Sequence, residues 1–292
     1  MSAAIKRKVA PGHAWHRLRP FIMSALLLLP WLSAGAAIQA NSLALLNREV
    51  QARAALLVDA ASGDILFSRN LTEPLPPAST EKLLTALLVY ERTQLKGDVL
   101  IQRSDTLVEP SRIPLHAGET VPVRTLVRSL LIGSDNDSAL ALARHVGGTV
   151  EAFVAMMNDR ARELGCAKSC FKNPNGLPAR GQVTTALDLL RIFQAAMAVP
   201  ELREICQTPS LTIRTAAGLQ TLRNHNKLLG AYPGMGPAKT GWTFNSKHTY
   251  AASATRNGRE LHLILLHTPD KWTDAKALFD FGFARYAKSS SK

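Results

Sequence analysis

Cysteine is scarce in this chain, and so are metal-binding patterns. Three cysteines among 292 residues are too few for a fold held together by disulfides. Cys166 and Cys170 lie four positions apart, which leaves open one local disulfide or two buried thiols, and Cys206 is expected in the core. The eight histidines are scattered, with no His–Glu–x–x–His pattern and no Cys/His cluster. The sequence therefore predicts no metal and no other cofactor.

No apolar run is long enough for a comfortable membrane span of about 20 residues. Residues 1–19 are basic and free of acids, Phe21 to Leu32 is apolar, and the small residues 33–37 follow. This order is typical of a secretory signal peptide, so we expect a signal over residues 1–40 with cleavage between Ala36 and Ala40. An uncleaved N-terminal anchor is the alternative. Either way the body is expected to be exported, periplasmic or extracytoplasmic, and after cleavage no stable membrane anchor is expected.

The excess of basic residues does not predict a nucleic-acid partner. Lys and Arg number 35 against 22 acidic residues, a net charge of +13. Removing the five basic residues of the leader leaves 30 against 22, a net +8. DNA is a poor partner for an exported protein, so we expect no nucleic acid. A mildly basic surface fits either anionic wall polymers or plain solvation.

The remaining composition predicts a folded protein, since 46% of residues are hydrophobic and 20% are charged. We expect a single domain over residues 41–292. Strands are expected at both ends of this range: Ala54–Asp59, Asp64–Ser68, Ala238–Thr243, Thr249–Thr255 and Glu260–His267. Helices are expected between them and at the end: Thr80–Tyr90, Val123–Ile132, Asp137–Val146, 149–164, 185–199 and Thr273–Ala287. This order predicts one sheet assembled from the two termini, with a helical middle region inserted.

Ser79 and Lys82 stand three positions apart at the start of a helix expected to be buried, so both project from one face. The pair supplies a nucleophile and a candidate base. Serine needs a base to take its proton, and Lys82 serves only when its pKa falls from about 10.4 to near 7. Burial beside a second ammonium, that of Lys239, shifts the pKa in this direction. Taken alone the spacing is weak evidence, because Ser169–Lys172 and Ser289–Lys292 share it.

Two further elements follow in the chain. Ser134-Asp135-Asn136 lies in a break between two expected helices, and Lys239-Thr240-Gly241 lies on an expected strand. In order and spacing the three elements resemble the signature of active-site serine penicillin-recognising enzymes. The chain resembles the low-molecular-weight penicillin-binding proteins, the D-alanyl-D-alanine carboxypeptidase family. The resemblance covers nearly all of residues 54–286, including Pro76-Pro77-Ala78, Asn173 to Leu177 and Asn224 to Leu229.

The resemblance implies an α/β (α+β) fold of the β-lactamase/transpeptidase type, with an antiparallel sheet and flanking helices. It implies that Ser79 forms an acyl-enzyme with peptidoglycan stem peptides ending in D-Ala-D-Ala, and that β-lactams are covalent inhibitors. Ser134 would relay the proton to the leaving amine, and Asn136 would hold the substrate amide and Lys82. The carboxylate of the substrate would bind Lys239 and Thr240, both from the third element.

The resemblance implies an oxyanion hole that consists of the backbone N–H groups of Ser79 and Trp242. Gly241 is expected to let the substrate backbone lie close to the strand. Trp242 is large for this position. It would narrow the cleft, shield it, or simply pack as a strand aromatic.

Three alternatives to a carboxypeptidase remain open at this point. A class A β-lactamase would need a Glu–x–x–Leu–Asn stretch, which the chain lacks, and Glu163 reads as a surface charge. A D,D-endopeptidase that cuts cross-links is favoured by the few residues after the last expected helix, where many carboxypeptidases of the family carry a β-domain and a membrane helix. An inactive wall-binding or β-lactam-sensing module is disfavoured by the complete set of three elements.

Overall fold

The structure is a computed structural model that describes residues 43–287. The chain divides into two compact units, Met1–Leu45 and Leu46–Lys292. Of the first unit only residues 43–45 are described, and they are helical. The expected signal peptide and its cleavage site therefore lie outside the described residues. All that follows concerns the second unit.

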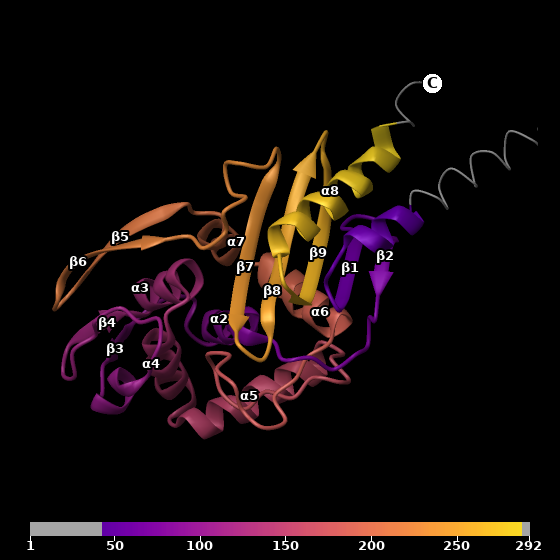
Figure 1. The fold of residues 1–292 in the computed structure, drawn as a ribbon. Helices are drawn as coiled ribbons and strands as arrows, with labels where there is room; N and C mark the ends of the chain where they lie inside the picture. Colours follow the sequence, from indigo (N-terminus) through magenta and orange to yellow (C-terminus); the bar gives the residue numbers. More distant parts are fainter. Residues whose placement is uncertain (1–42, 288–292) are drawn as a thin grey trace, which may run out of the picture. The chain divides into compact units, whose positions relative to one another are not determined.

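A five-stranded antiparallel sheet forms the centre of this unit (Figure 1). Its order is β2-β1-β9-β8-β7. The strands are β1 (Ala54–Asp59), β2 (Ile65–Arg69), β7 (Met235–Thr243), β8 (Lys247–Arg256) and β9 (Arg259–Thr268). β1 from one end of the unit pairs with β9 from the other, with Ala54 opposite Leu266. The prediction of one sheet built from both termini is confirmed.

Tight turns fix the register of the hairpins in this sheet. Asn257 and Gly258 join β8 to β9, and both have positive φ, 51° and 73°. Two central residues with positive φ are what a two-residue turn of type I′ requires, and Asn-Gly tolerates it. The turn joins the strands expected over Thr249–Thr255 and Glu260–His267.

Helices cover both faces of the sheet because every central strand is apolar on both sides. Leu56 and Ile264 face a cluster formed with α2 (Lys82–Thr93) and α6 (Ala186–Met197). The neighbouring Leu57 and Leu263 face the other cluster, which includes Phe279 of α8 (Lys271–Ala287). Period-two alternation thus feeds two separate cores. Figure 1 shows α8 crossing one face, with α2 and α6 on the other.

The middle of the chain is mainly helical, as predicted. It contains α3 (Val123–Arg128), the π-turn η3 (Ser129–Gly133), α4 (Asn136–Gly147) and α5 (Val150–Glu163). Thr149 and Thr185 cap α5 and α6, since their hydroxyls accept from the N–H groups of Ala152 and Asp188. Both threonines stand at the first position of the ranges expected to be helical, 149–164 and 185–199. The break between η3 and α4 holds Ser134 and Asp135.

Several short elements escape prediction. They are the hairpin of β3 (Asp98–Leu100) and β4 (Thr120–Pro122), the hairpin of β5 (Ser210–Thr215) and β6 (Gly218–Arg223), the 3-10 turns η1 (Ala78–Glu81) and η2 (Arg103–Leu107), and α7 (Pro200–Cys206). The expected helix from Thr80 starts as η1 and becomes α-helical only at Lys82. The last helix starts at Lys271, two residues before the expected Thr273.

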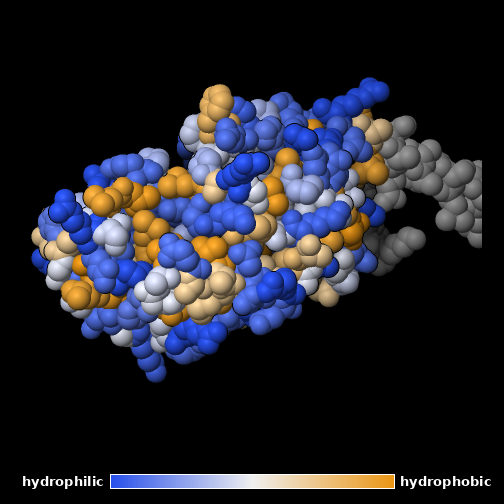
Figure 2. Space-filling view, turned by 90° about the horizontal axis from the view of Figure 1, so that it is seen from below, coloured by the Kyte–Doolittle hydropathy of each residue, from blue (hydrophilic) through white to orange (hydrophobic). Residues whose placement is uncertain are grey.

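The cysteines are free thiols in the described residues, so the local disulfide does not form. Cys166 and Cys206 are buried, the latter as expected for a core residue. None of the described helices is both long and apolar enough to cross a membrane. On the face shown in Figure 2, hydrophobic residues are interspersed with hydrophilic ones.

Candidate active site

Ser79 lies in η1, just before α2, and η1 packs against β7. Ala78, just before it, is buried and has a φ of 47°, a region that residues with a Cβ rarely adopt. Two contacts hold this turn in place. Thr249 of β8 donates a hydrogen bond to the carbonyl of Pro77 at 2.9 Å. A Cβ built on Gly176 would lie 2.2 Å from the carbonyl oxygen of Ala78, so only glycine allows this approach.

Lys82 is fully buried, one helical turn after Ser79. Its Nζ lies within hydrogen-bond distance of three oxygens: Ser79 Oγ at 2.9 Å, Asn136 Oδ1 at 2.7 Å and the backbone carbonyl of Asn175 at 2.6 Å. The amide and carbonyl oxygens can only accept hydrogen bonds, whereas the serine hydroxyl can also donate. A neutral amine satisfies all three by donating two protons and accepting the third from Ser79. This arrangement aims the lysine lone pair at the nucleophile.

The second lysine approaches from β7. Lys239 is 2% exposed, and its Nζ donates to Ser134 Oγ at 2.8 Å and to the carbonyl of Thr240 at 3.0 Å. Ser134 has a φ of 64°, a left-handed conformation in the break between η3 and α4. Such strain persists only where the surroundings fix it. Here the break turns the hydroxyl toward β7 instead of continuing the helix.

Asn136 connects the two halves of the site. Its Oδ1 accepts from Lys82, and its Nδ2 donates to the carbonyl of Pro110. Its backbone N–H also donates to the carbonyl of Ser111 at 2.7 Å. Because the amide group has partners on both sides, its orientation is fixed, and with it the position of Lys82 Nζ. The structure thus brings all five predicted catalytic side chains together: Ser79, Lys82, Ser134, Asn136 and Lys239.

Burial governs the charge of the two lysines. Burial lowers the pKa of Lys82 well below its usual value, and the positive charge of Lys239 lowers it further. Glu81, Asp135 and Asp137 act in the opposite direction but do not outweigh these effects. Burial also lowers the pKa of Lys239, to about 8. Burial therefore favours the neutral form of both lysines, and the charge of Lys239 adds to this effect at Lys82.

The other residues of the third element lie along β7, the edge strand of the sheet. Thr240 is buried, whereas Trp242 is 58% exposed. Packing as a strand aromatic is therefore the wrong interpretation of Trp242. The structure gives Gly241 a packing role that the sequence did not predict. A Cβ there would lie 2.8 Å from the backbone N of Ser79 and 2.3 Å from Thr249 Oγ1, so glycine lets β7 approach η1.

Sequence reasoning missed two residues of this site. The carbonyl of Asn175 accepts from Lys82, and the available signal was the Asn-Pro-Asn-Gly turn at residues 173–176. Glu81 is fully buried, and neither carboxyl oxygen has a hydrogen-bond partner in the described structure. Burial raises the pKa of Glu81 well above its usual range, although the charge of Lys82 opposes this. Burial therefore favours the uncharged form of Glu81 and weakens its opposition to the loss of the Lys82 proton.

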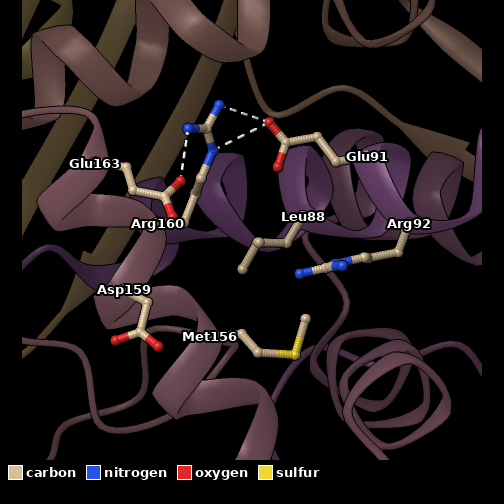
Figure 3. Close-up of a pocket in the computed structure, with 7 residues that line it drawn as sticks. All are labelled: Leu88, Glu91, Arg92, Met156, Asp159, Arg160 and Glu163. Atoms are coloured by element: carbon tan, nitrogen blue, oxygen red, sulfur yellow. Dashed lines mark hydrogen bonds and ion pairs between the residues drawn. The ribbon is translucent and has the colours of Figure 1, made fainter.

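A pocket lies between α2 and α5, and its lining includes none of the predicted site residues (Figure 3). Arg160 is its central charge and pairs with Glu91 at 2.8 Å and with Glu163 at 3.0 Å. The side chain of Glu163 is 63% exposed. This agrees with its interpretation as a surface charge, since it lies in the Arg160 pocket and not beside Ser79.

Comparison with known proteins agrees with this arrangement. The family model described as D-alanyl-D-alanine carboxypeptidase matches residues 39–270. The chain belongs to this family. It is 35% identical over 243 residues to the D-alanyl-D-alanine carboxypeptidase DacB2 of Mycobacterium tuberculosis, covering 80% of this chain and 83% of that protein. The resemblance on which the sequence analysis rests is confirmed, and with it the assignment to the serine-type D-Ala-D-Ala carboxypeptidases, which are hydrolases.

Other relatives and solved structures extend the comparison. DacF of Bacillus subtilis is 31% identical over 81% of this chain, and DacC of Escherichia coli is 30% identical over 80%. The matched region spans less than two thirds of these two relatives, 63% and 62% of their lengths. A solved D-alanyl-D-alanine carboxypeptidase of M. tuberculosis superposes with a TM-score of 0.77, at 35% identity over 80% of this chain and 92% of that one. The Streptomyces K15 DD-transpeptidase gives a TM-score of 0.76, at 27% identity over 80% of this chain and 98% of that one. The predicted fold class is confirmed.

Proposed function

We propose that this enzyme removes the terminal D-alanine from peptidoglycan stem peptides through an acyl-enzyme on Ser79. The Oγ of Ser79 attacks the carbonyl carbon of the penultimate D-Ala while its proton passes to Lys82. The peptide C–N bond then breaks, and the nitrogen of the leaving D-Ala takes up a proton. Water hydrolyses the ester and restores the serine hydroxyl. The observation that carries this proposal is the buried Lys82 Nζ, 2.9 Å from Ser79 Oγ.

Lys82 acts as the base because its neutral form fits its surroundings. Two acceptors take its N–H bonds and leave the lone pair to the serine hydroxyl. A general base of this kind contributes about 10²- to 10⁴-fold to a reaction rate. Ser134 accepts a hydrogen bond from Lys239 at 2.8 Å, and its hydroxyl returns the proton to the leaving amine. Asn136 holds Lys82 and the substrate amide.

Substrate recognition rests on β7. Lys239 keeps its charge below pH about 8 and, with Thr240, receives the terminal carboxylate. The backbone N–H groups of Ser79 and Trp242 form the oxyanion hole. The close approach of η1 to β7 at Gly241 supports this assignment, because it brings the backbone N of Ser79 to the strand that carries Trp242.

The family also suggests where the enzyme acts and what inhibits it. We propose a signal peptide over residues 1–40, cleavage at 36–40, and a peptidase domain over 41–292 that works in the periplasm or another extracytoplasmic space. β-Lactams would acylate Ser79. The Glu163 carboxylate pairs with Arg160, so we expect the penicilloyl ester to persist. Mass spectrometry after addition of penicillin tests this, and rapid loss of the adduct would instead indicate a β-lactamase.

A second candidate activity is cleavage of D,D cross-links. The D-alanyl-D-alanine endopeptidase of Pseudomonas aeruginosa is 31% identical over 78% of this chain and 75% of its own length. Digestion of purified muropeptides with and without penicillin separates the two activities. A carboxypeptidase releases D-alanine from monomers, whereas an endopeptidase converts dimers into monomers. A Ser79→Ala protein that kept either activity would contradict the assignment of the nucleophile.

A further inference from the structure

Glu81 is a buried carboxyl group that the proposed function leaves without a role. It lies in η1, one residue before Lys82, and it is fully buried. Neither of its carboxyl oxygens has a hydrogen-bond partner among the described residues. The N–H of Gly176 favours the charged form of this group, but its hydrogen bond goes to Asn173 Oδ1 at 2.8 Å. Burying a polar group without hydrogen bonds destabilises a fold, so the presence of Glu81 here requires an explanation.

No structural role in the described residues explains this side chain. Glu81 is the N-cap residue of α2, yet its side chain makes no capping hydrogen bond. Lys82 Nζ is held by oxygens of Ser79, Asn136 and Asn175, none of which belongs to Glu81. Glu81 therefore neither caps the helix nor forms an ion pair with the lysine that follows it.

Glu81 does act on Lys82 through its charge, as one member of a buried cluster. Burial and the charge of Lys239, from β7, both favour loss of the Lys82 proton. Three acids oppose this loss: Glu81 from η1, and Asp135 and Asp137 from the start of α4. The charge that acts on Glu81 in return is that of Lys82. The two groups thus favour each other's charged form.

Glu81 differs from the other two acids in having no second task. Asp135 accepts a hydrogen bond from Ser129 Oγ at 2.6 Å, across the break before α4. Asp137 accepts one from the N–H of Ile113 at 3.3 Å, which fastens a neighbouring loop. These bonds account for both aspartates as parts of the fold. For Glu81, the interaction with Lys82 is the one that remains to account for its burial.

We propose that Glu81 is a positioning residue that acts through Lys82 and keeps this amine a strong enough base to take the Ser79 proton. The inference rests on the proposed function, in which Lys82 is the base. The proton passes from Ser79 Oγ to Lys82 Nζ and stays there until the leaving nitrogen is protonated, and Glu81 exchanges no proton in this step. A general base works best when its affinity for protons suits the working pH. Glu81 offsets part of the effect of burial and of Lys239, which would otherwise make Lys82 too weak a base.

The test replaces Glu81 by glutamine and, separately, by methionine. The readout is the rate of penicilloylation of Ser79 as a function of pH, measured by stopped-flow kinetics or timed mass spectrometry. Both variants lose the acid, so Lys82 should give up its proton more readily, and the acid limb should move about one pH unit lower. The weaker base should also reduce the maximal rate by roughly two- to tenfold. An acid limb that stays in place or moves to higher pH would overturn the proposal.

Thermal unfolding distinguishes this role from a structural one. Burial raises the pKa of Glu81 above the ordinary 4.5, so above this pH the unfolded chain releases a proton that the folded protein keeps. Stability therefore falls as the pH rises above 4.5. Glu81→Met should have a higher Tm than the wild type at pH 7, and the difference should shrink toward pH 4.5. A lower Tm in both variants at pH 7, with the acid limb unmoved, would show that Glu81 serves the fold alone.

Glu91→Gln is the matched control. Glu91 lies on α2, the helix that follows Glu81, and its side chain is 32% exposed and paired with Arg160. The substitution removes the same charge outside the cleft. It should leave the acid limb where it is and should not raise the Tm.

The outcomes separate this inference from the proposed function. If the wild type forms no penicilloyl adduct, or its rate has no acid limb below the range of free lysine, the proposed function fails. If the wild type shows this limb and neither Glu81 variant moves it, Lys82 remains the base and the role given to Glu81 is wrong.

Discussion

The Ser79 cleft and the Arg160 pocket use charge in opposite ways. In the cleft, Lys82 and Lys239 are 0% and 2% exposed, and no carboxylate in the described residues lies within ion-pair distance of either ammonium. In the pocket, Arg160 is partly exposed and held by two carboxylates (Figure 3). Burial opposes the charge of Arg160, but its hydrogen bonds to Glu91 and Glu163 outweigh that effect and raise its pKa.

The difference shows what makes a basic side chain reactive. A paired cation in partial contact with water keeps its proton and does no proton-transfer chemistry. A buried cation without an ion-pair partner is destabilised, so its pKa falls toward neutrality. Four predictions, ordered by the expected size of the effect, test whether this contrast holds.

Replacing Lys82 by methionine should have the largest effect. Methionine has a similar length and tolerates burial, so the fold should persist. Loss of the base should slow penicilloylation of Ser79 by about 10²- to 10⁴-fold, which stopped-flow kinetics or timed mass spectrometry would measure. A rate within tenfold of the wild type would mean that another group takes the serine proton. Circular dichroism serves as the control for folding.

Lys239→Met should have a smaller effect with a distinctive pH signature. Loss of one charged hydrogen bond to the substrate carboxylate should lower kcat/KM by about 10- to 100-fold. Removing the Lys239 charge should also raise the pKa of Lys82, so the acid limb of the acylation profile should move to higher pH. An acid limb that stays in place would show that the two lysines are not coupled.

The same variant should change the pH dependence of stability. The pKa of Lys239 is depressed in the fold, to about 8 from 10.5, so the unfolded chain binds more protons between these values. Stability should therefore rise with pH in this window. The burial penalty, roughly 3 kcal/mol by this shift, is fully present below pH 8 and absent above 10.5. The difference in Tm between wild type and Lys239→Met should change across this window, and a constant difference would contradict the depressed pKa.

Arg160→Ala should have the smallest effect. Exposed ion pairs contribute about 0–1 kcal/mol to stability, and this pocket lies away from Ser79. Acylation by penicillin should stay within twofold of the wild type, and the free energy of unfolding should fall by no more than about 1 kcal/mol. A large loss of activity would show that the Arg160 pocket is linked to the cleft after all.

Periodic patterns made most of the fold predictable from the sequence. The central strand β1 is a continuous apolar run, β9 is mostly apolar from Leu261 to Leu266, and the capping threonines mark where α5 and α6 begin. The β3–β4 hairpin has strands of only three residues. The β5–β6 hairpin buries little beyond Ile213 and Leu222, so neither hairpin has a pattern strong enough to predict.

Some parts of the candidate site could likewise be predicted from the sequence, and others could not. Spacing predicted the side chains of Ser79, Lys82 and Lys239, because their chemistry depends on residue type. It could not predict the carbonyl of Asn175, since every residue carries one, nor the burial of Glu81. Nor could it predict that Gly241 lets η1 approach β7, because this approach exists only in the folded chain.

The rate of penicilloylation of Ser79 as a function of pH tests the central claim most directly. We predict a bell-shaped profile. The acid limb should reflect a Lys82 pKa well below that of free lysine, and the alkaline limb should begin near pH 8, where Lys239 loses its charge. A rate that rises continuously until pH about 10, the range of an ordinary lysine, would show that Lys82 is protonated at neutral pH and does not act as the base.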